Sequence, residues 1–169
     1  MNPYSSNREP ITDPKQALVT VRIIWAALAM GMVTFAGIVI VLAQAPAEAA
    51  APADDADPMF FYAACAMVVM AIPMGLFVRG QIFKRGWVGD VVTPQAYTTG
   101  NIIAWACCEA PVLFALVVVL ITGNIMPNVL PAAAAFVMHL ILWPNGRAMF
   151  TPAKSEPRNS LEDRYPTSH

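Results

Sequence analysis

Charge is scarce in this chain of 169 residues, since charged residues make up 12% of it and apolar residues 57%. Ordinary soluble domains carry roughly a quarter charged residues, so the composition disfavours a soluble fold. The net charge of −1 leaves no positive surplus that would attract nucleic acid. The sequence therefore predicts a single-domain membrane protein, whose first partner is the lipid bilayer and which binds no nucleic acid.

Motifs that support catalysis or cofactor binding are also missing. Cys65, Cys107 and Cys108 lie inside apolar segments, which predicts buried free thiols rather than disulfides. His139 is the only histidine in an apolar segment, so one chain cannot supply both axial ligands of a bis-histidine haem. The sequence contains no serine–histidine catalytic motif and no glycine-rich phosphate loop. We expect no enzymatic activity, no cofactor and no metal site.

Long apolar runs are the dominant feature of the sequence. A bilayer core of about 30 Å requires on the order of 20 helical residues, and backbone polar groups cannot stay unsatisfied in lipid. The runs are Ile23–Ala43, Met59–Val78, Ile102–Ile121 and Ile125–Trp143. The fourth is shorter and begins with Pro127 and Pro131, so we expect an irregular first turn. The sequence predicts an all-α membrane bundle of four helices in two hairpins, followed by a disordered tail over residues 144–169.

Basic residues are absent from two of the three connections between these runs, residues 44–58 and 122–124. The ten basic residues are Arg8, Lys15, Arg22, Arg79, Lys84, Arg85, Arg147, Lys154, Arg158 and Arg164. With four spans they all lie on one side of the membrane, which the positive-inside rule makes cytoplasmic. The sequence therefore predicts a cytoplasmic N-terminal segment over residues 1–22 and a cytoplasmic C-terminus.

The connection over residues 44–58 allows two other interpretations. Residues 43–45, Ala-Gln-Ala, have the form of a signal-peptide cleavage site, but the preceding apolar run exceeds the usual ~7–15 residues and Pro46 would follow the cut. The aspartates within residues 54–57 could hold a divalent cation loosely, although the glycine and distal glutamate of a calcium loop are missing. We expect a retained first span and a solvated acidic linker.

Small residues at four-residue spacing predict where these helices approach one another closely, because association in lipid depends on backbone packing. The candidate positions are Ala27 with Gly31, Ala71 with Gly75, Ala106 with Ala110, and the run Ala132–Ala135. Such spacing supports packing in an alanine-rich chain and does not indicate a function.

One carboxylate interrupts the third run. Glu109 lies about 10 Å into the hydrocarbon, counting 1.5 Å per residue from Ile102, where a charged side chain costs about 2.5 kcal/mol or more. His139 on the fourth run lies roughly 6 Å from the same interface and is the expected partner, directly or through water. Arg22 is the alternative partner, although its side chain can extend to the headgroups. Glu109, His139 and Arg22 thus form a candidate intramembrane polar site.

This site has a structural and a functional interpretation. In the first, Glu109 is a protonated or paired acid that fastens the third span to the fourth or the first. In the second, Glu109 carries a proton or cation and His139 acts as a relay. The structural interpretation is favoured, because the spans contain no second carboxylate and no pair of broken helices of the kind found in inverted-repeat transporters.

Two resemblances rest on particular segments. Residues 101–124, NIIAWACCEAPVLFALVVVLITGN, resemble the second helix of the rotor-ring subunit of proton-translocating ATP synthases, in which a glutamate and an alanine precede an aliphatic run. The likeness ends there, because the other spans lack the glycine-repeat helix with which ring subunits pack, so it implies no ring function. Arg22–Ala27, Tyr97–Asn124 and Trp143–Arg147 resemble a loosely defined group of small uncharacterised bacterial inner-membrane proteins with four helices. Ile121 departs from the group's pattern, which has leucine there. This resemblance implies a bacterial inner-membrane location and supplies no activity.

These expectations combine into one functional hypothesis. The chain is expected to be a non-enzymatic accessory or interaction subunit of a membrane assembly, bound to another membrane protein or to further copies of itself. The alternative is a small proton- or cation-linked transport protein that uses Glu109.

Overall fold

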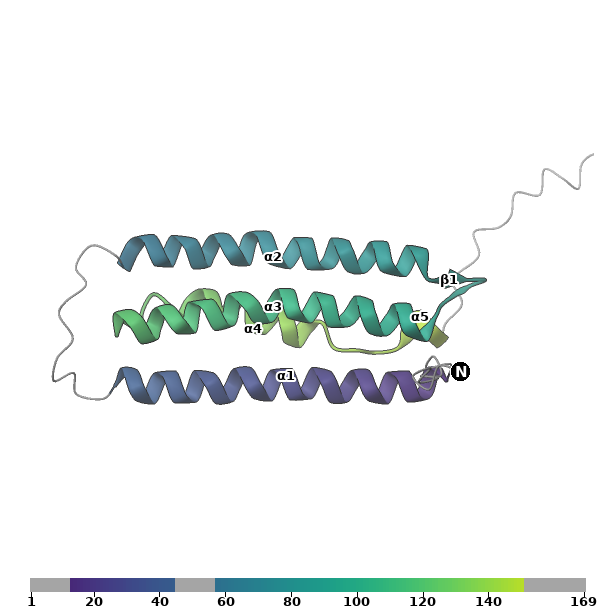
Figure 1. Cartoon of the computed structure of the whole chain (residues 1–169), viewed down its shortest axis with the longest axis horizontal. Coiled ribbons are helices and arrows are strands. Elements are labelled where there is room, and N and C mark those ends of the chain that lie inside the picture. The colour runs from purple at the N-terminus through teal and green to yellow at the C-terminus, as the bar shows by residue number, and fades with distance from the viewer. Residues whose placement is uncertain (1–12, 45–56, 151–169) are drawn as a thin grey trace, which may run out of the picture.

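The computed structural model describes residues 13–44 and 57–150 (Figure 1). This part of the chain contains the helices α1 (Pro14–Ala43), α2 (Asp57–Arg85), α3 (Pro94–Thr122), α4 (Val129–Ile141) and α5 (Arg147–Phe150). A small antiparallel hairpin, β1 (Trp87–Val88) with β2 (Val91–Val92), joins α2 to α3. The predicted all-α class is confirmed. Most of the predicted N-terminal segment, the acidic linker and the tail beyond residue 150 lie outside the described residues.

The long helices begin and end at capping residues. Asp13 accepts a hydrogen bond from the Lys15 amide at 2.9 Å, and Pro14 occupies the first helical turn, a position that proline favours. Thr93 caps α3 through the Ala96 amide at 3.4 Å. At the other end of α3, Gly123 adopts a left-handed φ of 68°, which glycine permits. These caps lie in polar sequence, so α1 and α3 extend beyond the apolar runs that predicted them.

Three of the helices have the dimensions of membrane spans. α1, α3 and α2 from Pro58 onward are each long and apolar enough to cross a membrane. Large apolar side chains stay exposed on them, such as Met30 at 69% and Met70 at 70%. A soluble protein rarely exposes contiguous apolar surface on this scale. The surface is therefore that of a protein whose helices face lipid.

Helix α3 is the centre of the bundle. It lies between α1 and α2 in Figure 1 and also packs against α4, while α1 and α2 make at most marginal contact with each other. Half of the most apolar stretch of α3, 50%, is buried, against 11% for those of α1 and α2. The other helices are therefore held together mainly through α3.

The fourth apolar run does not form one helix. Instead of Ile125–Trp143, α4 covers only Val129–Ile141, and its 13 residues span about 20 Å. The irregular start is confirmed, because the helix begins only after Pro127. Beyond Ile141 the chain continues without regular helix to α5 (Figure 1). Residues 144–150, predicted as disordered tail, are instead part of the fold, with Met149 buried.

The small-residue prediction is right at Gly75 and in the run Ala132–Ala135, where Ala132 and Ala135 are buried in the core, and wrong at other positions. A Cβ atom added to Gly75 would lie 2.6 Å from the Cys107 Cβ, so α2 and α3 meet there with almost no space. Gly31 has nothing within 4 Å of such an atom. The predicted partners Ala27, Ala106 and Ala110 are exposed as well. The stripes on α1 and α3 therefore do not pack against helices of this chain.

The bundle has two ends, which we name by the chain segments they contain. The termini end holds the start of α1, the end of α2, the start of α3, and α5; the loop end holds the end of α1, the end of α3 and the start of α4 (Figure 1). Within the described residues every basic side chain lies in the half at the termini end. These are Lys15, Arg22, Arg79, Lys84, Arg85 and Arg147.

Candidate functional site

The segment after α4, residues 142–146, runs beside α1 and α3. Its Leu142 amide still donates to the Met138 carbonyl at 3.1 Å, and the residues after Leu142 form no regular helix until α5. Two side chains of α1 bind backbone oxygens along this part of the chain. The indole Nε1 of Trp25 donates to the His139 carbonyl at 3.1 Å, and Nε of Arg22 donates to the Pro144 carbonyl at 3.4 Å. Helix α1 therefore holds both the last turn of α4 and the segment that follows it.

Helix α3 holds the same segment from the other side. The Trp105 indole Nε1 donates to the Leu142 carbonyl at 3.1 Å, and the Gly146 amide donates to Tyr97 Oη at 2.9 Å. Non-helical backbone at membrane depth is tolerated only where protein groups or trapped water satisfy it. The aromatic donors and acceptors of α1 and α3 provide that satisfaction. This arrangement explains how the chain can leave the α4 helix midway along the bundle.

His139 is fully buried at 0% exposure. Its ring stacks on Trp25 with centroids 5.5 Å apart, and the Trp105 ring lies 6.2 Å away. Nε2 lies 3.4 Å from the Trp25 carbonyl oxygen. That oxygen can only accept, so Nε2 carries the proton of this bond and a neutral ring presents Nδ1 as an acceptor. Nδ1 has no hydrogen-bond partner among the described residues.

Arg22 joins the same group of side chains through a ring rather than a carboxylate. Its guanidinium carbon lies 5.7 Å from the centroid of the Trp143 ring, a cation–π arrangement. Trp143 meets Trp25 edge to face at 4.6 Å between centroids. We call Trp25, Trp105, His139 and Trp143 the tryptophan cluster. The structure thus brings two of the three predicted site residues, Arg22 and His139, to one cluster.

Glu109 makes no hydrogen bond with any residue of that cluster. It is partly buried on α3, one turn beyond Trp105. No hydrogen bond or ion pair reaches its carboxyl group from any described residue. The expected direct pair with His139 is therefore absent, because the imidazole is held between two indole rings and its Nε2 faces the Trp25 carbonyl. Arg22 does not replace it, since its Nε is engaged by Pro144.

The aromatic partners of the segment escaped the sequence-based reasoning. Trp25, Tyr97, Trp105 and Trp143 have the ordinary sequence signature of interfacial anchors, so only the fold shows that three of them bind backbone. The sequence did contain a signal for the non-helical segment, because Pro144 and Gly146 are residues that disfavour helix. Asn101, buried between Tyr97 and Trp105, was missed too, and its Oδ1 has no partner within the described residues.

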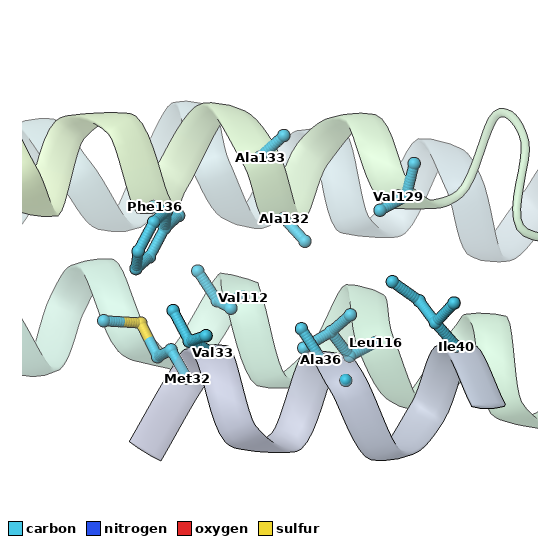
Figure 2. A pocket seen from close by; sticks show the side chains of 11 residues that line it. Met32, Val33, Ala36, Ile40, Val112, Leu116, Val129, Ala132, Ala133 and Phe136 are labelled. Carbon is cyan, nitrogen blue, oxygen red and sulfur yellow. The ribbon is translucent and has the colours of Figure 1, made fainter. Parts of the chain in front are cut away.

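The half of the bundle at the loop end contains a cavity of about 360 Å³ between α1, α3 and α4. Figure 2 shows Met32 and Ala36 of α1, Val112 and Leu116 of α3, and Ala132 and Phe136 of α4 around it. Every side chain of its lining is apolar. The cavity is therefore suited to hydrocarbon and not to an ion.

Comparison with known proteins adds no further constraint on this arrangement. No protein-family model, no curated protein and no solved structure matches the chain. Both resemblances drawn from sequence segments therefore stay predictions, and the function is inferred from the geometry.

Proposed function

We propose that this chain is a bacterial inner-membrane protein that crosses the bilayer four times, has both termini in the cytoplasm and acts as a non-enzymatic interaction subunit of a membrane assembly. The single observation that carries the interaction role is the unpartnered face of α1. We call this surface, formed by Ala27, Gly31, Thr34 and Ile38, the α1 docking face.

The α1 docking face is exposed along its whole length. A Cβ atom added to Gly31 or Gly37 would meet nothing within 4 Å. Beside this face a shallow hollow of about 410 Å³ follows α1 around Gly37. Val21 and Val39 lie on a different side of the helix and are buried, so that side is the one that packs inside the bundle. Small residues on a lipid-exposed helix allow a second helix to approach closely, so this face suits a helix of another membrane protein.

The proposed topology is supported by the dimensions of the fourth crossing. Helix α4 covers about 20 Å, and the three residues between Leu142 and Gly146 add up to about 10 Å where they are extended. The sum is close to the roughly 30 Å of a bilayer core. The basic side chains of the described part also gather at the termini end, which favours that end as cytoplasmic.

A photo-crosslinking experiment in native membranes tests the interaction role. Benzoylphenylalanine at Thr34 should give one discrete crosslinked product, whereas the same probe at Met70, equally exposed on α2, should give none. Gly31→Leu should abolish the Thr34 product. A product of twice the monomer mass would identify a second copy as the partner. Labelling of lipid alone at both positions would overturn the proposal.

Transport through Glu109 is the second candidate function, and one observation favours it. The Glu109 carboxyl group lies in an apolar helix without a partner among the described residues, and such groups mark ion pathways in other membrane proteins. Proton or sodium flux into liposomes containing the purified protein, lost in Glu109→Gln, would establish transport. Flux equal to that of empty liposomes would leave the interaction role as the sole proposal.

A further inference from the structure

The apolar cavity runs along the bundle, and its three walls are formed by α1, α3 and α4. Figure 2 shows Phe136 and Met32 towards one end, and Val129 and Ile40 towards the other. Helices α1 and α4 make little direct contact with each other. The cavity therefore has the shape and lining of a site for a hydrocarbon tail, with access from the lipid between α1 and α4.

Two of these helices, α3 and α4, carry polar side chains just beyond the cavity, on the side of the termini end. On α3, Glu109 shares a face with the lining residues Val112 and Leu116, because positions three and seven apart fall on one side of a helix. On α4, His139 bears the same relation to Phe136 and Ala132. The cavity thus lies one helical turn from a carboxyl group and an imidazole.

Both of these groups can form further hydrogen bonds. The Glu109 carboxyl group and His139 Nδ1 are without partners in the described part of the chain. A protonated carboxyl group can donate and accept, while Nδ1 accepts. This end therefore suits a small ring that bears hydroxyl or carbonyl oxygens.

The depth of Glu109 restricts the class of ligand further. At about 10 Å below the interface, a charged phospholipid headgroup would lose its hydration at a cost of several kcal/mol. A neutral head on a long apolar tail does not incur that cost. Membrane quinones and quinols, which carry an oxygen-bearing ring on an isoprenoid tail, have this chemistry.

We propose that the cavity between α1, α3 and α4 binds a prenylated quinone or quinol, with its tail along Val112, Leu116 and Phe136 and its ring at Glu109. The site does not include the α1 docking face, so it goes beyond the proposed interaction role. Binding would link the assembly to the pool of lipid-soluble redox carriers, with no chemical step assigned to this chain.

The test uses the purified full-length protein in detergent, with a dimethoxy-methyl-benzoquinone carrying a ten-carbon tail as the probe. Its quinone ring quenches indole fluorescence, so binding at Glu109, one turn from Trp105 on α3, should give saturable quenching. Ala132→Leu, at a residue whose side chain points into the cavity in Figure 2, should weaken binding at least about tenfold, the effect of one misfitting group in an apolar pocket. Ala134→Leu is the matched control, because Ala134 is an exposed residue of the same helix that does not line the cavity. Its affinity should stay within about twofold.

Further variants distinguish the contribution of the tail to binding from that of the ring. Ala36→Leu fills the cavity from α1 and replaces Ala132→Leu if that protein fails to fold. Glu109→Leu should weaken binding, whereas Glu109→Gln should retain most of it, because an amide still donates and accepts. The same quinone without its tail should not saturate. Quenching that is linear and equal in all variants would overturn the proposal. Displacement of the probe by phosphatidylethanolamine at equal concentration would also overturn it, since the cavity would then be a phospholipid chain site.

Discussion

The two halves of the bundle are held together by different kinds of contact. At the termini end the buried cluster contains Tyr97 and Trp105, and side chains bind backbone oxygens of a neighbouring segment. At the loop end the buried cluster consists of residues such as Met32, Leu116 and Ala135, with a cavity beside it. One half is joined by directional hydrogen bonds and the other by apolar packing that leaves space.

The difference follows from where the backbone leaves the helix. Hydrogen bonds have narrow geometric requirements, so a non-helical segment inside a membrane bundle must be positioned by fixed donors and acceptors. An apolar interface imposes no such requirement and gains little from the hydrophobic effect in lipid. We therefore expect the half at the termini end to be rigid and intolerant of change, and the half at the loop end to be adaptable enough to admit a ligand.

The largest effect is expected at Gly75, where the two halves meet on α2. Gly75→Leu should lower the free energy of unfolding by about 3 kcal/mol or more, because its side chain would overlap the Cys107 Cβ and force α2 from α3. Thermal unfolding in detergent measures this loss. Gly31→Leu is the control, with nothing within 4 Å, and should change stability by less than about 0.5 kcal/mol. Equal losses of unfolding free energy in the two variants would mean that α1 packs against another helix at Gly31.

Removal of one backbone-binding indole tests the half at the termini end. Trp105→Phe should cost about 1–3 kcal/mol, because the buried Leu142 carbonyl loses its donor. Trp143→Phe makes the same chemical change at a side chain that is 47% exposed and should cost less. Chemical unfolding with both variants gives the comparison. An equal cost would indicate that the Leu142 carbonyl is hydrated.

Insertion of bulk into each half compares their adaptability directly. Ala17→Leu places a larger side chain at a fully buried position of the termini half and should cost about 1–3 kcal/mol through overpacking. Ala36→Leu fills the cavity of the other half and should be neutral within about 1 kcal/mol. The midpoints of thermal unfolding measure both. Similar losses would show that the loop half is packed as tightly as the termini half.

The smallest effect is expected for the coupling between Glu109 and His139. The double-mutant cycle of Glu109→Leu and His139→Leu should be additive within about 0.5 kcal/mol, since no hydrogen bond joins the two side chains. Stability measured for the two single variants and the double variant gives the coupling energy. A coupling above about 1 kcal/mol would restore the pair that sequence reasoning expected and would place the carboxyl group inside the cluster.

Much of the fold could be predicted because hydrophobic runs and caps act locally. The spans at 23–43, 59–78 and 102–121 lie within α1, α2 and α3, and Gly75 was correctly placed at a close contact. The expected pair of Glu109 with His139 is absent, and its absence could not be predicted from depth along the helices alone. Matched depth leaves the rotation of each helix undetermined, and the indole rings that hold His139 come from residues far away in the sequence.

The sequence by itself determined that this protein is helical and apolar on its outer surface, because a chain in lipid must satisfy its backbone within each segment. It also determined which residues carry the unusual chemistry, since one carboxyl group and one imidazole lie in the apolar runs. Only the tertiary structure decided that the fourth run breaks after Ile141 and is held by α1 and α3. It also decided which small-residue face stays free and where a cavity opens. These features depend on contacts between segments more than a hundred residues apart, whose geometry no local pattern specifies.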